Sequence, residues 1–362
     1  MKGFADQLEG EQIAALADYL FTPPPQAIHW GMEEMRPTHR VLLDPADLAD
    51  RPVHKADLLN LFVVVETGDH HATILDGDRF EPLARIPTHR ALHGGPKFSP
   101  EGRFVYFASR DGWVSKFDLY SLRYVAEIRA GINSRNLAVS SDGRYALLGN
   151  YLPHTLVLLD TGDLSPIKVI PVRDAAGIGS RVSAVYDAPP RHSFIAALKD
   201  IPEVWEIPYD DDPLPVYNGP MHDYRMGEGM ALQSGRFPVR RIRLDDYLDD
   251  FFFSQDYREL IGAARNAKNG QVVNLDAGRK IAELDLDGMP HLGSGITFDY
   301  QGNTVLATPH LKKAEVTVID MRTWRTIKRI PTQGPGFFMR SHENTPYAWV
   351  DVFFGPNKDA VH

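Results

Sequence analysis

Three histidines lie in short polar segments at comparable places, each just before a turn and an apolar run. His93 is in ALHGGPKFSP, His291 is in GMPHLGSG and His342 is in FFMRSHENTP. Neutral imidazole is a good iron ligand, and two imidazoles facing each other across a channel would suit a planar macrocycle. Gly94 and Gly95 would let backbone and such a group approach closely. For each histidine the alternative is an ordinary loop residue that is solvated or bonded to backbone.

Four arginines lie at or near loop ends that are expected to face the same opening. They are Arg90, Arg110, Arg135 and Arg265. The planar guanidinium matches a carboxylate, so these side chains are candidates for holding the acid groups of a tetrapyrrole. A salt bridge to a neighbouring aspartate remains the alternative for each. The sequence has no G-x-S-x-G, P-loop or H-E-x-x-H motif, so it gives no local indication of a serine hydrolase, a phosphate-binding loop or a tetrahedral metal site.

A repeat of a little over forty residues has to position these side chains. Its most regular mark is a short apolar run that ends in an acid, at Asp76, Asp118, Asp160, Glu206, Asp276 and Asp320. The successive spacings are 42, 42, 46, 70 and 44 residues, and the long interval contains a loop rich in Pro, Gly and Asp over residues 209–236. Between these marks a turn and a β-rich run recur, as in SPEGRFVYFASR and SSDGRYALLGN. Short strands at this period predict the four-stranded blades of a β-propeller.

The fold class that follows is all-β, a β-propeller preceded by one short helix. Six blades can be counted, and a seventh begins in PYAWVDVFF at residues 346–354. Because a propeller closes by pairing its last blade with its first, the chain end in mid-blade predicts a fragment, or a ring closed by something else. The segment EGEQIAALADYLFTPPP, residues 9–25, has apolar residues at helical spacing and a proline stop. It predicts an amphipathic helix of about three turns.

The composition excludes several classes of function. The 362 residues carry a net charge of -9, and the one basic cluster, RFPVRRIR, is followed directly by DDYLDD, so we expect no nucleic-acid partner. There is no cysteine, which excludes disulfides, iron–sulfur clusters and the C-x-x-C-H attachment of a c-type haem. No apolar run reaches the length of a membrane span, and MKGFADQLEGEQ lacks the apolar region of a secretory signal.

Several segments resemble one known family. LLNLFVVVETGDHHATILDG, ALHGGPKFSPEGRFVYFASRDGW, AEIRAGINSRNLAVS, GNYLPH and GMPHLGSG are similar to the haem d1 domain of the cytochrome cd1 nitrite reductases. The resemblance implies an eight-bladed propeller with haem d1 in its channel, of which about six and a half blades lie in residues 30–362. Residues 1–29 resemble the last helix and linker of the c-type cytochrome domain that precedes such propellers, and its haem-attachment part is missing here.

The resemblance also implies roles for particular residues. His93 falls on the proximal iron ligand of the family, and His291 falls on one of the two distal histidines of the nitrite reductases. The other distal histidine falls in YLDDFFFSQDYRE, where this sequence has Asp249. A carboxylate at that place would repel nitrite, so Asp249 argues against nitrite reduction.

A sister group fits better. The segments SRVSAVYDAPPRHSF, ALKDIPEVWE and GPGFFMRSHENTPYAWVDVFFGP are similar to the dihydro-haem d1 dehydrogenases of haem d1 biosynthesis. This resemblance implies that His93 and His291 ligate the iron of haem d1 or dihydro-haem d1, and that a propionate of the substrate is oxidised to an acrylate. A base removes a proton while two electrons leave through the macrocycle and the c-type haem of the full-length family. The candidate catalytic residues in this chain are His342, as the base, and Asp249.

Two other functions remain open from the sequence. One is nitrite reduction of the cytochrome cd1 type, and the other is a non-catalytic propeller that binds a tetrapyrrole or a protein. The resemblance implies three kinds of partner: a tetrapyrrole substrate, an electron-accepting cytochrome, and other haem d1 biosynthesis proteins or the nitrite reductase. It also implies a periplasmic location, although no signal is expected in this chain.

Overall fold

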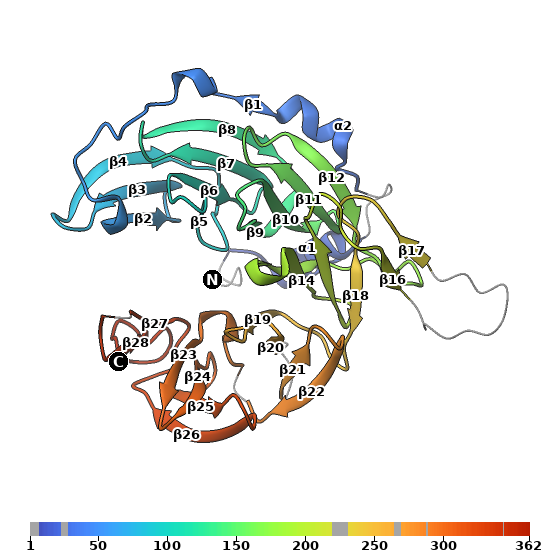
Figure 1. Ribbon diagram of the computed structural model, residues 1–362, viewed down its shortest axis with the longest axis vertical. Helices are drawn as coiled ribbons and strands as arrows, with labels where there is room; N and C mark the ends of the chain where they lie inside the picture. The colour runs from blue at the N-terminus through green and yellow to red at the C-terminus, as the bar shows by residue number, and fades with distance from the viewer. Residues whose placement is uncertain (1–6, 23–27, 219–230, 264–268, 287–288, 343) are drawn as a thin grey trace.

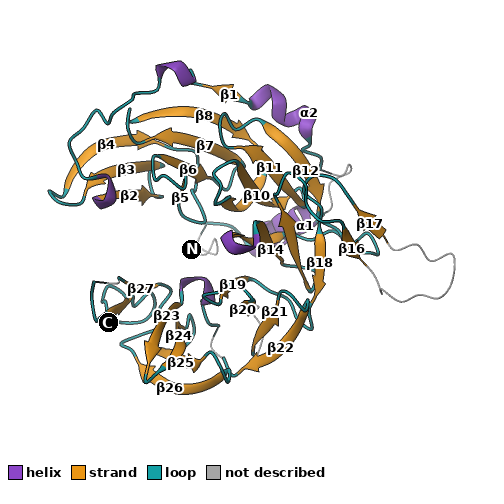
Figure 2. Ribbon diagram, viewed as in Figure 1, coloured by secondary structure: helices purple, strands orange, loops and turns teal. Residues whose placement is uncertain are grey.

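The computed structural model describes residues 7–22, 28–218, 231–263, 269–286, 289–342 and 344–362. Within these residues, antiparallel sheets follow one another in chain order around a common centre (Figure 1). Nearly all of the regular structure is strand, with a few short helices between and beside the sheets (Figure 2). The all-β propeller predicted from the repeat is confirmed.

The described residues before 172 form three sheets. The first sheet contains β2 (Leu61–Glu66), β3 (His71–Asp76) and β4 (Glu81–Pro87). The second contains β5 (Lys97–Phe98), β6 (Phe104–Ala108), β7 (Trp113–Asp118) and β8 (Arg123–Arg129), with β1 (Arg40–Val41) on the outer edge of β8. The third contains β9 (Asn133–Val139), β10 (Tyr145–Leu152), β11 (Thr155–Asp160) and β12 (Pro166–Pro171).

Three further sheets and the start of another follow along the chain. The fourth sheet contains β13 (Val182–Ala188), β14 (Ser193–Leu198), β15 (Glu203–Pro208) and β18 (Arg240–Arg243). The fifth contains β19 (Asp250–Phe253), β20 (Glu259–Ala263), β21 (Gly270–Asn274) and β22 (Arg279–Leu284). The sixth contains β23 (Ile296–Tyr300), β24 (Asn303–Pro309), β25 (Glu315–Asp320) and β26 (Arg325–Pro331), and β27 (Met339–Ser341) pairs with β28 (Ala348–Val350).

Two departures from the simple repeat have local causes. The long interval of the repeat is an insertion between β15 and β18, where β16 (Val216–Asn218) and β17 (Ala231–Gln233) form a separate hairpin. The seventh blade begins one strand earlier than predicted, because the short polar segment around Arg340 pairs with Trp349 as β27. Three residues of mixed polarity give no period-two pattern that would mark such a strand in advance.

The recurrent acids have a structural role at the ends of strands. Asp118 closes β7, and its carboxylate accepts from the backbone N–H of Tyr120 at 3.2 Å and of Ser121 at 3.1 Å. Asp320 closes β25 and accepts from the N–H of Arg322 at 3.0 Å. A carboxylate that bonds the amides just after it stabilises a tight turn, which explains why the acid repeats with the blades.

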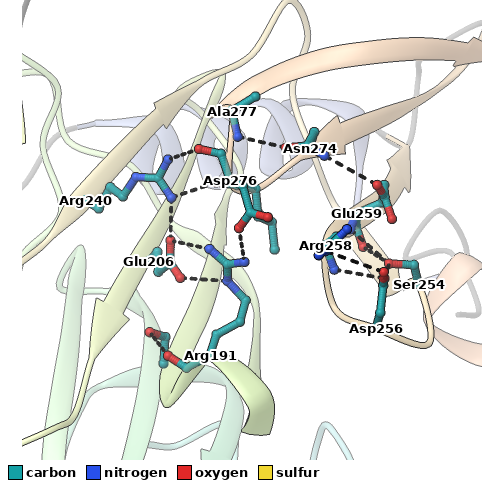
Figure 3. A network of polar contacts seen from close by, with 12 residues as sticks. Arg191, Glu206, Arg240, Ser254, Asp256, Arg258, Glu259, Asn274, Asp276 and Ala277 are labelled. Atoms are coloured by element: carbon teal, nitrogen blue, oxygen red, sulfur yellow. Dashed lines mark hydrogen bonds and ion pairs between the residues drawn. The ribbon is translucent and has the colours of Figure 1, made fainter.

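At Glu206 the acid instead joins two sheets, as Figure 3 shows. Its carboxylate lies 2.9 Å from Arg191 Nε and 2.8 Å from Arg240 Nη1. Arg191 also reaches Asp276 of the fifth sheet, with 2.6 Å between Nη1 and Oδ1. The Glu206 side chain is only 6% exposed, so this charge depends on its two guanidinium partners.

The core is divided into clusters that lie between neighbouring sheets. Leu147 and Leu158 of the third sheet pack with Val185 and Phe194 of the fourth in one fully buried cluster. Burial of apolar surface between twisted sheets supplies most of the stabilisation and fixes their spacing. The inner strands are therefore held rigidly at the centre of the arc, where the site lies.

The helices are few and short. α1 (Gly10–Phe21) confirms the predicted helix, and Glu9 and Gln12 form a capping box at its start. The others are α2 (Met32–Met35) and the 3-10 turns η1 (Arg36–Thr38), η2 (Pro45–Asp47), η3 (Leu58–Asn60), η4 (Pro189–Arg191) and η5 (Leu292–Ser294). Among the described residues, no helix combines the length and the apolar character that crossing a bilayer requires.

Candidate functional site

A cavity of about 740 Å³ lies at the centre of the arc. Strands of six sheets contribute to its wall, namely β2, β6, β9, β13, β19 and β27. Inner strands of a propeller converge on its axis, so residues far apart in the sequence meet in one space. A cavity of this size is large enough to bury most of an organic ligand.

His93 is oriented by two neighbouring sheets. Its backbone N–H donates to Ala108 O at 3.0 Å, and its ring Nδ1 lies 2.8 Å from the carbonyl oxygen of Arg135 on β9. A carbonyl oxygen can only accept, so Nδ1 carries the proton and Nε2 keeps its lone pair. The guanidinium of Arg135 contacts this Nε2. In the structure Nε2 accepts from this guanidinium, and it is the ring nitrogen whose lone pair would bind a metal in place of that contact.

The surroundings of His93 keep its ring neutral. Burial, together with the positive charges of Arg135 and Arg110, lowers the pKa of His93 to about 4. Only the neutral ring has a lone pair for a metal, so His93 is in its ligating form at pH 7. Gly94 and Gly95 follow with φ values of +83° and +71°, a left-handed backbone that a side chain would strain.

His291 lies between the fifth and sixth sheets, directly before η5. Its ring Nδ1 is 2.9 Å from Ser294 Oγ, and its Nε2 is 3.6 Å from Asp250 Oδ2. The ring stacks at a tilt on Phe337, with 4.0 Å between centroids. Burial lowers the pKa of His291, while the nearby carboxylate of Asp250 opposes this effect. His291 is thus a second buried imidazole on the same cavity.

Asp250 is a hub of hydrogen bonds beside His291. It accepts from the Tyr186 hydroxyl at 3.0 Å and from the backbone N–H of Gly293 at 2.8 Å. A side chain at Gly293 would collide with this carboxylate, so glycine permits the close approach. Burial is the main cause that raises the pKa of Tyr186, so its hydroxyl stays a donor. These bonds fix the carboxylate next to the histidine.

Cationic side chains gather around the ring of Tyr151, near the end of β10. We call this the Tyr151 cluster, and the charged groups lie 5.3 to 6.0 Å from the ring centroid: Arg110, Arg135, Arg181 and Lys199. An electron-rich ring face attracts cations, which helps to hold several of them close together. Arg135 and Lys199 of this cluster line the cavity. The cluster makes that part of the wall positive.

The predicted site residues divide into those that meet at the cavity and those that do not. The cavity is lined by His93, Gly94, Gly95, Arg135, Asp249 and His291. Arg90, Arg110 and His342 are not in its lining, although Arg110 lies behind it in the Tyr151 cluster. Arg90 and His342 are exposed, and His342 Nδ1 accepts from the backbone N–H of Asn344. Arg265 lies outside the described residues.

Other lining residues were not predicted from the sequence. They include Lys97, Asn136, Tyr186, Lys199, Asp250 and Arg340. Two of them stood next to residues that were singled out, since Asp250 follows Asp249 and Asn136 follows Arg135. Side chains alternate between the two faces of a strand, so this pattern does not predict that two successive residues both line the cavity. The two successive acids, Asp249 and Asp250, were the one indication in the sequence.

The comparisons with known proteins agree with this architecture. Residues 56–218 and 232–362 match the family described as the cytochrome D1 heme domain. The chain belongs to this family. Both imidazoles and the Tyr151 cluster fall within the matched ranges.

Relatives within and near this family differ in their printed functions. The chain is 54% identical to the dihydro-heme d1 dehydrogenase of Pseudomonas aeruginosa, over 100% of this chain and 69% of the relative. It is 24% identical to the nitrite reductase of Stutzerimonas stutzeri, over 100% of this chain and 65% of that relative. It is 29% identical to Protein NirF of Pseudomonas aeruginosa, over 83% of this chain and 74% of that relative.

A solved structure is similar along almost the whole chain. It is titled dihydro-heme d1 dehydrogenase NirN in complex with DHE, and it is 53% identical with a TM-score of 0.87. The match covers 99% of this chain and 72% of that one. The fold of this chain is therefore similar to that of a protein whose structure is titled as a complex with DHE.

The side chains around the cavity fit a tetrapyrrole with acidic groups. Arg110 Nη1 and Asn136 Oδ1 are buried and have no hydrogen-bond partner within the described part of the chain. A buried group of this kind costs free energy until a partner is supplied, and a carboxylate would supply one for the guanidinium. Two imidazoles, a positive wall and an unpaired guanidinium together suit an iron tetrapyrrole with carboxylate side chains.

Proposed function

We propose that this chain is a dihydro-haem d1 dehydrogenase, which oxidises a propionate of its tetrapyrrole substrate to an acrylate in haem d1 biosynthesis. The observation that carries the proposal is the central cavity, where a neutral His93 with a fixed tautomer borders about 740 Å³ of space. The 54% identity to a relative of that name supports the same reaction. The similar structure titled as a complex with DHE supports the same substrate.

The reaction converts a –CH2–CH2– unit of the propionate into –CH=CH–, and two protons and two electrons leave. The conjugated macrocycle supplies the path by which the electrons depart, and a one-electron acceptor of the cytochrome class takes them in turn. His93 and His291, which both line the cavity, would hold the iron. Arg135 and Arg110 would bind carboxylate groups of the substrate and fix its orientation.

The two predicted catalytic residues receive different roles. Asp249 contacts Lys199, so we assign it to the charge of the cavity wall rather than to proton transfer. His342 lies two residues beyond Arg340, which lines the cavity, and it stays our proposed proton acceptor. Arg90 is exposed and outside the lining, so it takes no part in the proposal.

The family context extends the proposal to location and partners. We assign residues 1–29, which include α1, to the end of a c-type cytochrome domain. This chain has no cysteine for a c-type haem, so its electrons would pass to a haem carried elsewhere. We place the protein in the periplasm, with other haem d1 biosynthesis proteins or the nitrite reductase as partners.

The experiment is conversion of dihydro-haem d1 by the purified chain, with oxidised cytochrome c as acceptor, followed in the visible spectrum. We expect a six-coordinate, low-spin spectrum when the tetrapyrrole binds to the wild-type chain, and we expect His93→Ala to lose that spectrum. Product should form only in the protein that retains His93. His71→Gln is the matched control, because His71 lies on β3 outside the cavity lining. Binding without any conversion in the presence of acceptor would contradict the dehydrogenase and leave a tetrapyrrole-binding propeller.

Nitrite reduction is the second candidate, favoured by the 24% identity to a nitrite reductase over the whole chain. The carboxylate of Asp250 lies 3.6 Å from Nε2 of His291 and would repel nitrite beside that imidazole. Nitrite turnover by the haem d1-loaded chain, measured as nitric oxide release, separates this candidate from the first. We expect none above the rate of free haem d1.

A further inference from the structure

The cavity wall carries more positive than negative charge. Its cationic side chains are Lys97, Arg135, Lys199 and Arg340, and its carboxylates are Asp249 and Asp250. Among the residues that the structure describes, four positive groups and two negative groups leave a surplus of two positive charges. Such a wall attracts an anionic ligand. A larger positive surplus favours a ligand with more carboxylates, and a smaller surplus favours a ligand with fewer.

The cations of the Tyr151 cluster differ in their partners. Arg181 is paired with Asp200, with 2.9 Å between Nε and Oδ2. Lys199 is paired with Asp249, and both side chains are about one-fifth exposed, at 18% and 21%. Arg110 and Arg135 form no ion pair with a carboxylate of the described residues.

The pairing of Lys199 has a direct effect on the ligand, because both members of the pair line the cavity. A lysine beside a carboxylate presents little net charge to a group a few ångströms further away. The same lysine alone would add a third surplus charge to the wall. Asp249 without Lys199 would lower the surplus of the wall by one positive charge.

We infer that Asp249 is a specificity-determining residue, which neutralises Lys199 and leaves Lys97, Arg135 and Arg340 as the lining cations that receive the carboxylates of the substrate. The inference rests on the proposed function, since it takes a carboxylate-bearing tetrapyrrole as the ligand. It goes further by stating what selects among tetrapyrroles. The Lys199–Asp249 pair tunes the cavity to a macrocycle of limited negative charge.

The experiment compares two metal-free porphyrins that differ in the number of their carboxylates, coproporphyrin III with more and protoporphyrin IX with fewer. Dissociation constants are measured by porphyrin absorbance at low and at high ionic strength, for wild type and variants. Asp249→Asn raises the positive surplus of the lining to three, Lys199→Met lowers it to one, and the double variant returns it to two. The matched control is Asp200→Asn, which unmasks Arg181 of the same cluster outside the cavity lining.

The readout is the ratio of the two affinities, because a general loss of fold affects both porphyrins alike. We expect the preference for coproporphyrin to rise about five- to tenfold in Asp249→Asn and to fall by a similar factor in Lys199→Met at low salt. The double variant should return to within about twofold of wild type, and high salt should compress all of these differences. Asp200→Asn should change the ratio less than Asp249→Asn does.

A ratio that stays constant across the four forms, or that moves the same way in both single variants, overturns the inference. This outcome is separate from failure of the proposed function. A chain that converts dihydro-haem d1 but shows a constant ratio refutes only the role of Asp249. A chain that shows the expected ratios but no conversion refutes only the dehydrogenase.

Discussion

Arg135→Met should make binding of an iron tetrapyrrole more sensitive to acid, through His93. The guanidinium of Arg135 touches the ring, and after burial its charge is the largest cause that lowers the pKa of His93 to about 4. Methionine keeps much of the volume and removes the charge. The pKa of His93 should then rise from about 4 toward its ordinary 6.5, while burial continues to hold it below that value.

The size of the effect follows from the fraction of neutral imidazole. With a pKa of about 4, about 97% of His93 is neutral at pH 5.5, so affinity for iron hardly changes between pH 7.5 and 5.5. With an unperturbed pKa, only about 9% would be neutral at pH 5.5, and affinity would fall about tenfold over the same range. Because burial persists in the variant, we expect a loss of about two- to fivefold.

The assay is the dissociation constant of ferric haem d1 at pH 7.5 and 5.5, measured from the visible spectrum, and the ratio of the two is compared between proteins. Lys199→Met is the control, since Lys199 also lines the cavity but is not among the charges that act on His93 or His291. Carboxylates of the ligand titrate equally in both variants and cancel in the comparison. Equal ratios for Arg135→Met, Lys199→Met and wild type would refute the electrostatic account of His93.

Three further variants test the fold and the site. Burial raises the pKa of Asp187 to about 6, so the free energy of unfolding falls as pH rises from about 4 to 6. Asp187→Asn should therefore raise the free energy of unfolding by about 1–3 kcal/mol at pH 7.5 and by little at pH 4, as measured by urea unfolding. Glu206→Gln leaves Arg191 and Arg240 without their shared buried charge and should cost about 2–4 kcal/mol in thermal unfolding, and a cost below about 0.5 would contradict the network. Gly94→Ala should cost about 1 kcal/mol, because φ is +83°, and should weaken tetrapyrrole binding.

The blades could be predicted because each repeat carries its own local instructions. An apolar run that ends in an acid, as at Asp118 or Asp320, specifies both a strand and the turn that follows it. The same logic located the inserted loop, since only one interval exceeded the period. It failed at β27, where three residues around Arg340 become a strand only because residues 348–350 pair with them. Pairing of that kind is a tertiary effect that local pattern does not contain.

The histidines of the site could be predicted, but only some of its charges could: Arg135 and Asp249 were predicted and Lys199 was not. His93 and His291 stand beside glycines in short loops, a local feature that is visible in the sequence. The Tyr151 cluster assembles side chains from position 135 on strand β9 and from positions 110, 181 and 199 on three connections between strands. Their meeting depends on how the sheets twist around the axis, and no spacing in the chain records that. The sequence likewise could not show that Arg90 and His342 are exposed and outside the lining, and the role of His342 in proton transfer stays a prediction.

The two imidazoles differ in how firmly the fold sets their tautomers, and this difference follows from their partners. Nδ1 of His93 faces a backbone carbonyl, which only accepts, so its proton stays on Nδ1 and its lone pair on Nε2. Nδ1 of His291 faces the Ser294 hydroxyl, which either donates or accepts, and that hydroxyl also lies 2.7 Å from the carbonyl oxygen of Phe337. When the hydroxyl donates to Phe337, Nδ1 of His291 must carry a proton, and Nε2 is left facing Asp250 with a lone pair. A carboxylate beside a lone pair is unfavourable, so a positive centre such as iron near Nε2 stabilises this arrangement.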